Sequence, residues 1–299
     1  MTIAWQGDEL ERRRRSNPEP QILPPEEVDF RSGDFRSDDS SYRIDPAAAV
    51  QNQPAQSSRS RILIGWSYAP ATYVLVGINI AVYGCMVLGG VSWWAPTAQQ
   101  ILHWGANRGV NEILQGEWWR LLSATFVHVG IIHIGTNMWC LWNLGLLGEP
   151  LMGAFGIFGV YVLTGIAGNL LSSAVNPAIV GAGASGAVFG IAGILIMLLN
   201  SPHLPFPRQE LRRLRRSVIY FAVVNLAIGA STLLYSGGIK IDNMAHLGGV
   251  LSGLALGVPL APVLGTGKAR YQSRQKLAFS VLAGGLLLFG YGMVRFWKS

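Results

Sequence analysis

The sequence has few charged residues and few cysteines. Charged residues make up 13% of the 299 residues and hydrophobic residues 50%, with a mean hydropathy of +0.34, whereas soluble domains carry roughly a quarter charged residues. This composition argues against an ordinary soluble domain and favours a membrane protein. Both cysteines, Cys85 and Cys140, fall in apolar segments, so neither a disulfide framework nor a CxxC metal site is indicated.

The N-terminal segment lacks long apolar runs. It has no apolar core of the kind found in secretory signals, and it carries Arg12 to Arg15 among many Pro, Ser, Asp and Glu residues. We expect residues 1–65 to form a disordered polar cytosolic leader, followed by a membrane domain over 66–299. The formal net charge of +7 does not predict a nucleic-acid partner, because its arginines lie mostly in this leader and in short loops between apolar stretches.

Seven apolar runs are long enough to cross a bilayer, which takes about 20 residues. No repeat at solenoid spacing is present, and the many glycines lie inside the apolar runs, as membrane helices allow. The fold class predicted from these runs is an all-α polytopic membrane protein. The approximate spans are 72–90, 121–144, 151–171, 184–200, 218–235, 245–263 and 277–294.

Positive residues predict the orientation of the spans. They gather ahead of the first, fifth and seventh spans, and the positive-inside rule assigns these segments to the cytosol. The N-terminus is then cytosolic and the C-terminus external. The external connection 91–120 is rich in tryptophan, so we expect short amphipathic helices in the membrane interface there. The positive residues are Arg59, Arg61, Arg208, Arg212, Arg213, Arg215, Arg216, Lys268, Arg270, Arg274 and Lys276.

Polar side chains occur near the predicted external ends of three spans, where each needs a partner or a function. The second span contains His128, His133 and Asn137, the fourth opens near Ser185, and the sixth opens near His246. The fourth and sixth spans run in the same direction. Ser185 and His246 are therefore expected at similar depth in the outer part of the bilayer.

Small residues predict which helices pack closely. Ala245, Gly249, Gly253 and Gly257 recur every four residues in the sixth span, and Ala182, Gly186 and Gly190 form a matching stripe in the fourth. Glycine stripes let helix backbones approach closely. If the two stripes face each other, the Ser185 hydroxyl can reach the His246 imidazole, which is the arrangement of a base-activated serine.

These residues resemble the motifs of the rhomboid family. Residues 183–186 (GASG) resemble its GxSG motif, and residues 245–249 (AHLGG) followed by Gly253 resemble its catalytic-histidine helix. Trp119-Arg120 resembles the WR pair of the first external loop, residues 133–137 the HxxxN motif, and residues 145–149 a GxxxE pattern. The resemblance covers residues 70–265, and several motifs in the correct order make it specific. It implies a six-helix bundle plus a seventh transmembrane helix over 277–294.

The resemblance also implies an activity and a site. The expected function is an intramembrane serine endopeptidase that cuts transmembrane protein substrates near their helix ends, without a cofactor or metal. Ser185 would be the nucleophile and His246 the general base and acid, with an oxyanion hole formed by His133, Asn137 and the Ser185 backbone amide. Supporting residues would be Gly183, Phe189, which would pack on the imidazole, His128, Gly249, Gly253, Trp119 and Arg120.

Several side chains have a second interpretation. His133 and Asn137 lie four residues apart on one helix face and each offers an N–H donor to an oxyanion, yet they would equally suit an interhelical hydrogen bond. Arg120 either extends to lipid headgroups or anchors the loop. Glu149 is expected to cap or brace the cytosolic end. Asp242 lies one helical turn before His246, but the resemblance implies a dyad without a third member.

Other functional classes remain as alternatives or are set aside. An α/β-hydrolase elbow requires GxSxG between a strand and a helix, and a metalloprotease requires a cluster such as HExxH; neither is present. A non-proteolytic rhomboid-like protein that binds membrane clients would lack the serine or the histidine. A transporter would carry charges deep in its spans.

We expect a bacterial inner membrane location, with the active site toward the external side. Residues 236–243 are expected to form a mobile lid over this site.

Overall fold

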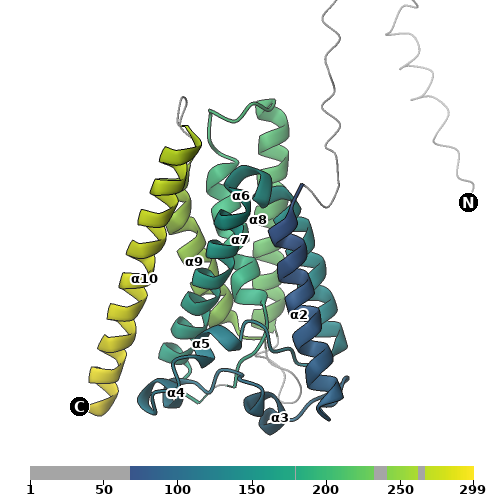
Figure 1. The fold of residues 1–299 in the computed structure, drawn as a ribbon, viewed down its shortest axis with the longest axis vertical. Helices are drawn as coiled ribbons and strands as arrows, with labels where there is room; N and C mark the ends of the chain where they lie inside the picture. The colour runs from purple at the N-terminus through teal and green to yellow at the C-terminus, as the bar shows by residue number, and fades with distance from the viewer. Residues whose placement is uncertain (1–67, 179, 232–240, 262–266) are drawn as a thin grey trace, which may run out of the picture. The chain divides into compact units, whose positions relative to one another are not determined.

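The computed structural model describes residues 68–178, 180–231, 241–261 and 267–299. The secondary-structure elements in this part of the chain are all helices (Figure 1). The predicted leader, 1–65, and most of the predicted lid lie outside the described residues. The helices are α2 (Pro70–Leu88), α3 (Ala98–His103), α4 (Val110–Leu114), α5 (Arg120–Ser123), α6 (Ile131–Val175), α7 (Ser185–Leu198), α8 (Arg208–Ser231), α9 (Asn243–Leu260) and α10 (Lys268–Lys298).

The helices that could cross a membrane confirm the predicted fold class. Within the described part of the chain, α2, α6, α8, α9 and α10 are long and apolar enough to do so, and α7 is apolar but shorter. The 45 residues of α6 contain the later part of the second predicted span and the whole of the third, and two helical segments join at Gly153 (φ 76, ψ 167). A positive φ suits glycine, so this residue lets the chain turn between two helical segments. The protein is an all-helical multi-pass membrane protein.

At three places the helix boundaries differ from the predicted span boundaries. The second span was expected from residue 121, but continuous helix begins only at Ile131, after Gly130 (φ 100). A Cβ atom at Gly130 would lie 2.4 Å from the Trp94 carbonyl oxygen, so the chain bends at Gly130, where it passes the connection 91–120. The fifth and seventh helices begin earlier than predicted, at Arg208 and Lys268. Hydropathy missed these starts because arginine, lysine and glutamine are polar yet form helices well.

The connection between the first two spans contains the short helices that were expected. Helix α3 begins with a capping box, in which the Thr97 and Gln100 side chains each accept a hydrogen bond from the other residue's backbone N–H. Asn107 then forms an isolated antiparallel bridge with Gly181, just ahead of α7, and its side-chain amide donates to the Asn169 carbonyl oxygen at 3.1 Å. These bonds fix the connection to the end of α6 and to the start of α7.

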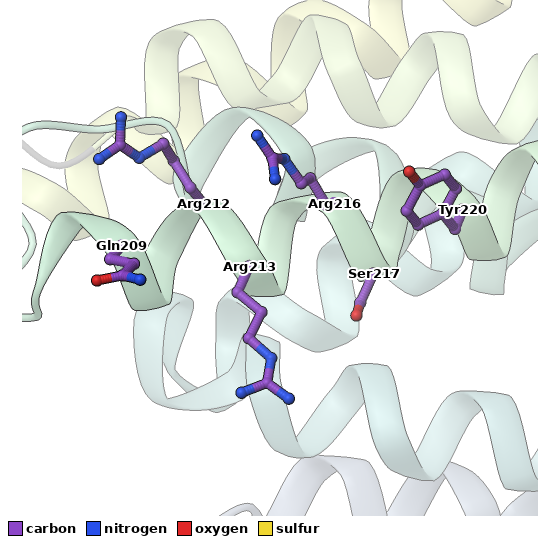
Figure 2. Close-up of a pocket in the computed structure, with 6 residues that line it drawn as sticks. All are labelled: Gln209, Arg212, Arg213, Arg216, Ser217 and Tyr220. Atoms are coloured by element: carbon purple, nitrogen blue, oxygen red, sulfur yellow. The ribbon is translucent and has the colours of Figure 1, made fainter. Parts of the chain in front are cut away.

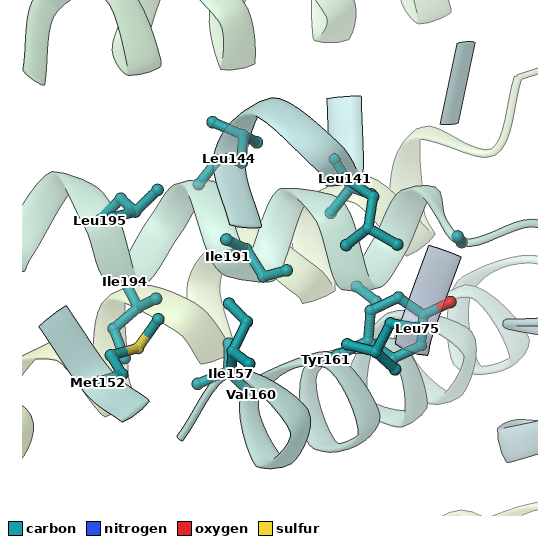
Figure 3. Close-up of a cluster of buried hydrophobic side chains, with 14 of the residues drawn as sticks. Leu75, Leu141, Leu144, Met152, Ile157, Val160, Tyr161, Ile191, Ile194 and Leu195 are labelled. Carbon is teal, nitrogen blue, oxygen red and sulfur yellow. The ribbon is translucent and has the colours of Figure 1, made fainter. Parts of the chain in front are cut away.

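Helix α7 lies at the centre of the bundle. Its residues Gly186 to Leu195 are all buried, and Ile191, Ile194 and Leu195 pack in one cluster with side chains of α2 and α6 (Figure 3). A helix surrounded by protein does not need the full length that lipid contact would require, because its ends are covered by neighbouring elements. The burial of α7 therefore explains how a 14-residue helix can serve as one of the predicted spans.

Glu149 braces the bundle at the end opposite α3, α4 and α5. Its carboxylate, which is 3% exposed, accepts hydrogen bonds from the Ala71 N–H at 2.9 Å, the Thr72 N–H at 2.7 Å and the Thr72 hydroxyl at 2.7 Å. A carboxylate at a helix N-terminus satisfies free N–H groups and interacts favourably with the helix dipole. The prediction that Glu149 caps or braces is confirmed, since it caps α2 from α6.

Candidate active site

Helices α7 and α9 pack through their glycine stripes, as the sequence predicted. A Cβ atom added at Gly249 would lie 2.0 Å from the Gly186 carbonyl oxygen, and one added at Gly253 would lie 2.1 Å from the Gly190 carbonyl oxygen. Real side chains do not approach backbone atoms this closely, so only glycine permits this helix separation. The consequence is that the N-terminal turns of both helices lie side by side, with Ser185 on one and His246 on the other.

A second close contact, between α9 and α6, was not predicted. A Cβ atom at Gly168 would lie 2.5 Å from the Ala245 carbonyl oxygen, and one at Gly248 would lie 2.9 Å from the Ala167 carbonyl oxygen. The turn of α9 that carries His246 is therefore held between α6 and α7. Two glycines in the sequence could have indicated this contact. They are Gly248, next to the predicted stripe of α9, and Gly168 in the third predicted span.

Phe189 and His246 form a stacked pair beside Ser185. Their ring centroids are 4.2 Å apart with an interplanar angle of 11°. Ser185 is the first residue of α7 and Phe189 follows four residues later, so both side chains project from one face of the helix. The imidazole that stacks on Phe189 thus lies on the face of α7 from which Ser185 projects.

The environments of the two side chains differ. His246 is 6% exposed, and its Nδ1 atom is buried without a hydrogen-bond partner among the described residues. Ser185 is only partly buried. Within the described residues no hydrogen bond joins its hydroxyl to the imidazole. Catalytic hydrogen bonds are often long in substrate-free enzymes and tighten in the substrate complex.

Gly183 brings the chain close to His133 and Asn137. It has φ 132, a conformation that favours glycine. A Cβ atom there would lie 2.6 Å from His133 Cε1, 2.8 Å from His133 Nε2 and 3.7 Å from Asn137 Nδ2. The start of α6 and the segment that leads into Ser185 are therefore in direct contact.

The hydrogen bonds of His133 and Asn137 leave donors directed to this region. The Val129 N–H donates to His133 Nδ1 at 3.3 Å, so a neutral ring carries its hydrogen on Nε2, the atom near Gly183. Asn137 Nδ2 donates one hydrogen to the His133 carbonyl oxygen at 2.9 Å, which leaves the second free. The N–H of Ser185, in the first turn of α7, has no acceptor within its own helix. The side-chain donors of His133 and Asn137 and the backbone N–H of Ser185 thus lie near the segment that leads into α7.

The comparison with known proteins identifies the family. Residues 115–263 match the family model described as "Rhomboid domain". The chain belongs to the rhomboid family. It is 32% identical to "Rhomboid protease GluP" of Bacillus subtilis over 65% of the chain and 36% of that protein. It is 27% identical to "Rhomboid protease AarA" of Providencia stuartii, over 80% of the chain and 87% of that protein.

A plant relative matches over a smaller share of the chain. The chain is 35% identical to "RHOMBOID-like protein 1" of Arabidopsis thaliana, over 47% of the chain and 34% of that protein. The match thus spans about a third of the length of this protein, as it does for the Bacillus relative. All the site residues predicted from the sequence lie within the rhomboid domain, whereas α2 and α10 lie outside the matched residues.

His128 supports the chain next to the serine of the rhomboid domain. It is fully buried. Its Nδ1 lies 3.1 Å from the Phe126 carbonyl oxygen, and its Nε2 accepts a hydrogen bond from the Ala184 N–H at 3.4 Å. The ring therefore links the non-helical segment before α6 to the residue that precedes Ser185.

The described residues contain no group of three or more His, Cys, Asp or Glu side chains placed to hold a metal ion.

Asp242 interacts with backbone and hydroxyl groups rather than with the imidazole. Its side chain accepts a hydrogen bond from the Ala245 N–H at 3.0 Å, which caps α9, and another from the Ser172 hydroxyl at 2.5 Å. Burial raises the pKa of this carboxyl group above its usual value. Asp242 therefore holds the start of α9 against α6, one turn before His246.

Arg120 anchors the connection 91–120 between α2 and the start of the rhomboid domain. Its guanidinium donates to the Leu102 carbonyl oxygen at 2.7 Å and to the Ala106 carbonyl oxygen at 3.2 Å, and it pairs with the Glu117 carboxylate at 2.9 Å. It also lies 4.5 Å from the centre of the half-exposed Trp119 ring. The hydrogen bond from Arg120 lowers the pKa of Glu117. Of the two predicted roles for Arg120, this geometry corresponds to anchoring the loop.

Proposed function

We propose that this rhomboid protein is an intramembrane serine endopeptidase that cleaves transmembrane protein substrates near their helix ends. The observation that carries the proposal is the stacked Phe189–His246 pair on the Ser185 face of α7. The two bacterial relatives whose names contain "Rhomboid protease" support the same activity. Ser185 is assigned as the nucleophile and His246 as its base.

The proposed reaction begins with attack of the Ser185 oxygen on a substrate carbonyl carbon. The imidazole of His246 takes the hydroxyl proton and then delivers it to the leaving amine, which leaves an acyl-enzyme ester at Ser185. Water hydrolyses this ester, with His246 again acting as base. Because Asp242 is engaged by Ala245 and Ser172, we assign a dyad rather than a triad.

The proposed oxyanion hole uses the three donors at the start of α7. His133 Nε2, the free N–H of Asn137 and the Ser185 backbone N–H would stabilise the negative charge that develops on the substrate carbonyl oxygen. Fixed donors in a site with little water are worth more than donors in water, because they need no reorganisation during the reaction. Gly183 contributes by leaving the space that lets His133 approach.

We also propose an orientation for the protein. The basic N-terminal ends of α8 and α10 lie at one end of the bundle, and α3, α4 and α5 lie at the other (Figure 1). The positive-inside rule assigns the basic end to the cytosol. The active site would then lie toward the external side, and the architecture suits a bacterial inner membrane. The partners would be the lipid bilayer and transmembrane substrates.

The alternative is a non-proteolytic rhomboid-like protein that binds membrane clients. A direct test is cleavage of a transmembrane test substrate by the full chain in liposomes, compared with Ser185→Ala and His246→Ala at equal amounts of folded protein. We expect both variants to lose cleavage, because each lacks one of the two groups on which the proposed attack depends. Equal activity in all three proteins, or none in the unsubstituted protein with several substrates, would favour the alternative.

A further inference from the structure

The cytosolic half of helix α8, as oriented above, carries an unpartnered basic face. A hollow of about 580 Å³ lies along it, lined by Gln209, Arg212, Arg213, Arg216, Ser217 and Tyr220, and Figure 2 shows these side chains along the helix surface. Their spacing of three, four and seven residues places them on one side of α8. All six are exposed. The hollow therefore opens away from the bundle.

The three arginines of this hollow are free to bind a ligand. Among the described residues, Arg212, Arg213 and Arg216 have no ion-pair or hydrogen-bond partner. Arg215 differs, because it donates to the Asn200 side chain at the end of α7 and is partly buried. One arginine of the group thus fixes α8 to the bundle, while the other three leave their guanidinium groups exposed. Glu210, in the first turn, is not part of the lining.

The same side of α8 becomes apolar after Tyr220. Val223 and Val224 follow on it, and they are 57% and 52% exposed. A phospholipid has this order of chemistry along its length: a phosphate, then the ester region, then acyl chains. Tyrosine is common at the level where headgroups meet hydrocarbon. The charge and the apolar surface therefore follow one another along one face in the same order as in a phospholipid.

We propose that this face of α8 is a binding site for an anionic phospholipid. The phosphate of the lipid lies among Arg212, Arg213 and Arg216. The hydroxyl groups of Ser217 and Tyr220 contact the lipid headgroup. One acyl chain lies along Val223 and Val224. The planar guanidinium group binds phosphate oxygens through paired N–H donors, which a lysine ammonium group cannot reproduce. A net negative headgroup is favoured because three positive charges face it without an acidic residue in the lining.

The test is a lipid titration of the purified full chain in neutral detergent, followed by native mass spectrometry. Phosphatidylglycerol is compared with phosphatidylcholine for the unsubstituted chain, for R212Q/R213Q/R216Q and for the charge-matched control K268Q/R270Q/K276Q, whose exposed residues lie at the start of α10. We expect phosphatidylglycerol to bind the α8 variant at least about tenfold more weakly, because each basic residue near an anionic lipid contributes about 1 kcal/mol. The control should retain the affinity of the unsubstituted chain.

Three outcomes would overturn the proposal. Equal weakening in the α8 variant and the control would mean general attraction to the basic end of the protein. Equal affinity for the two lipids would remove the role of charge. Competition by glycerophosphoglycerol, which lacks acyl chains, as strong as that by the lipid would remove the role of the apolar segment. R212K/R213K/R216K keeps the positive charge and has a similar helix propensity. If this variant binds phosphatidylglycerol as tightly as the unsubstituted chain does, recognition by guanidinium groups is contradicted.

Discussion

The Phe189 ring lies flat on the His246 imidazole, with 4.2 Å between centroids and an interplanar angle of 11°. The contact fixes the plane of the ring that we assign as base, and it comes from the helix that begins with Ser185. His246 Nδ1 has no hydrogen-bond partner in the described part of the chain, so packing rather than a carboxylate orients the imidazole.

Phe189→Leu should reduce turnover by about tenfold to a hundredfold, because small displacements of a positioned catalytic group are costly. Leucine keeps most of the apolar volume, so the change of helix packing stays small. Steady-state cleavage kinetics measure the effect. The control is Phe155→Leu, at a half-exposed ring that packs on Phe279 instead. Similar turnover in both variants would mean that the stacking does not position the base.

Gly253→Leu should impair cleavage although Gly253 lies almost two turns from His246. A side chain at this position would collide with the Gly190 backbone and push α9 away from α7, which separates the proposed dyad. The control is Gly285→Leu in α10, where an added Cβ atom has nothing within 4 Å. Activity is measured per amount of folded, monodisperse protein. Full activity of the folded Gly253→Leu protein would contradict the coupling of helix separation to the site.

Asn137→Ala tests the proposed oxyanion hole apart from the dyad. The loss of one oxyanion donor typically costs about a hundredfold to a thousandfold in turnover, while Ser185 and His246 remain in place. We expect cleavage that is slow but measurable, with little change in KM. A loss as complete as that of Ser185→Ala would assign Asn137 a structural role. Unchanged turnover would remove it from the site.

Asp242→Asn tests the assignment of a dyad. Asparagine can still accept the hydrogen bond from the Ala245 N–H and cap α9, so turnover should fall far less than in His246→Ala. Asp242→Ala removes the cap and the contact with Ser172, and should destabilise the protein by about 1 kcal/mol. Thermal unfolding and turnover are measured on both. Loss of turnover in Asp242→Asn equal to that in His246→Ala would establish a third catalytic member.

The helices and their main packing could be predicted because bilayer length and glycine spacing are local properties of the sequence. For that reason the close packing of α9 on α7 through Gly249 and Gly253 could be predicted from the sequence. The segment 124–130, which is not helical, could not be predicted, since its conformation depends on Trp94, a distant residue that approaches Gly130. The early starts of α8 and α10 were missed because hydropathy does not register polar helix formers.

Side-chain partners on different helices were predictable only where the family resemblance supplied them, as it did for Phe189 and His246. The common face of His133 and Asn137 follows from their spacing, whereas the approach of His133 to Gly183 depends on two segments about fifty residues apart. The same holds for the bond from Ala184 to His128 and for the contact of Asp242 with Ser172. Composition and spacing carry no information on such contacts, because they arise from tertiary packing.

If Ser185 is the nucleophile, a covalent inhibitor should leave its adduct on this residue. The full chain in detergent is treated with an activity-directed serine phosphonate, digested and analysed by peptide mass spectrometry, together with Ser185→Ala and His246→Ala. We expect one adduct on Ser185, none in Ser185→Ala, and strongly reduced labelling in His246→Ala. An adduct on another serine, or equal labelling of the Ser185→Ala protein, would show that Ser185 is not the nucleophile.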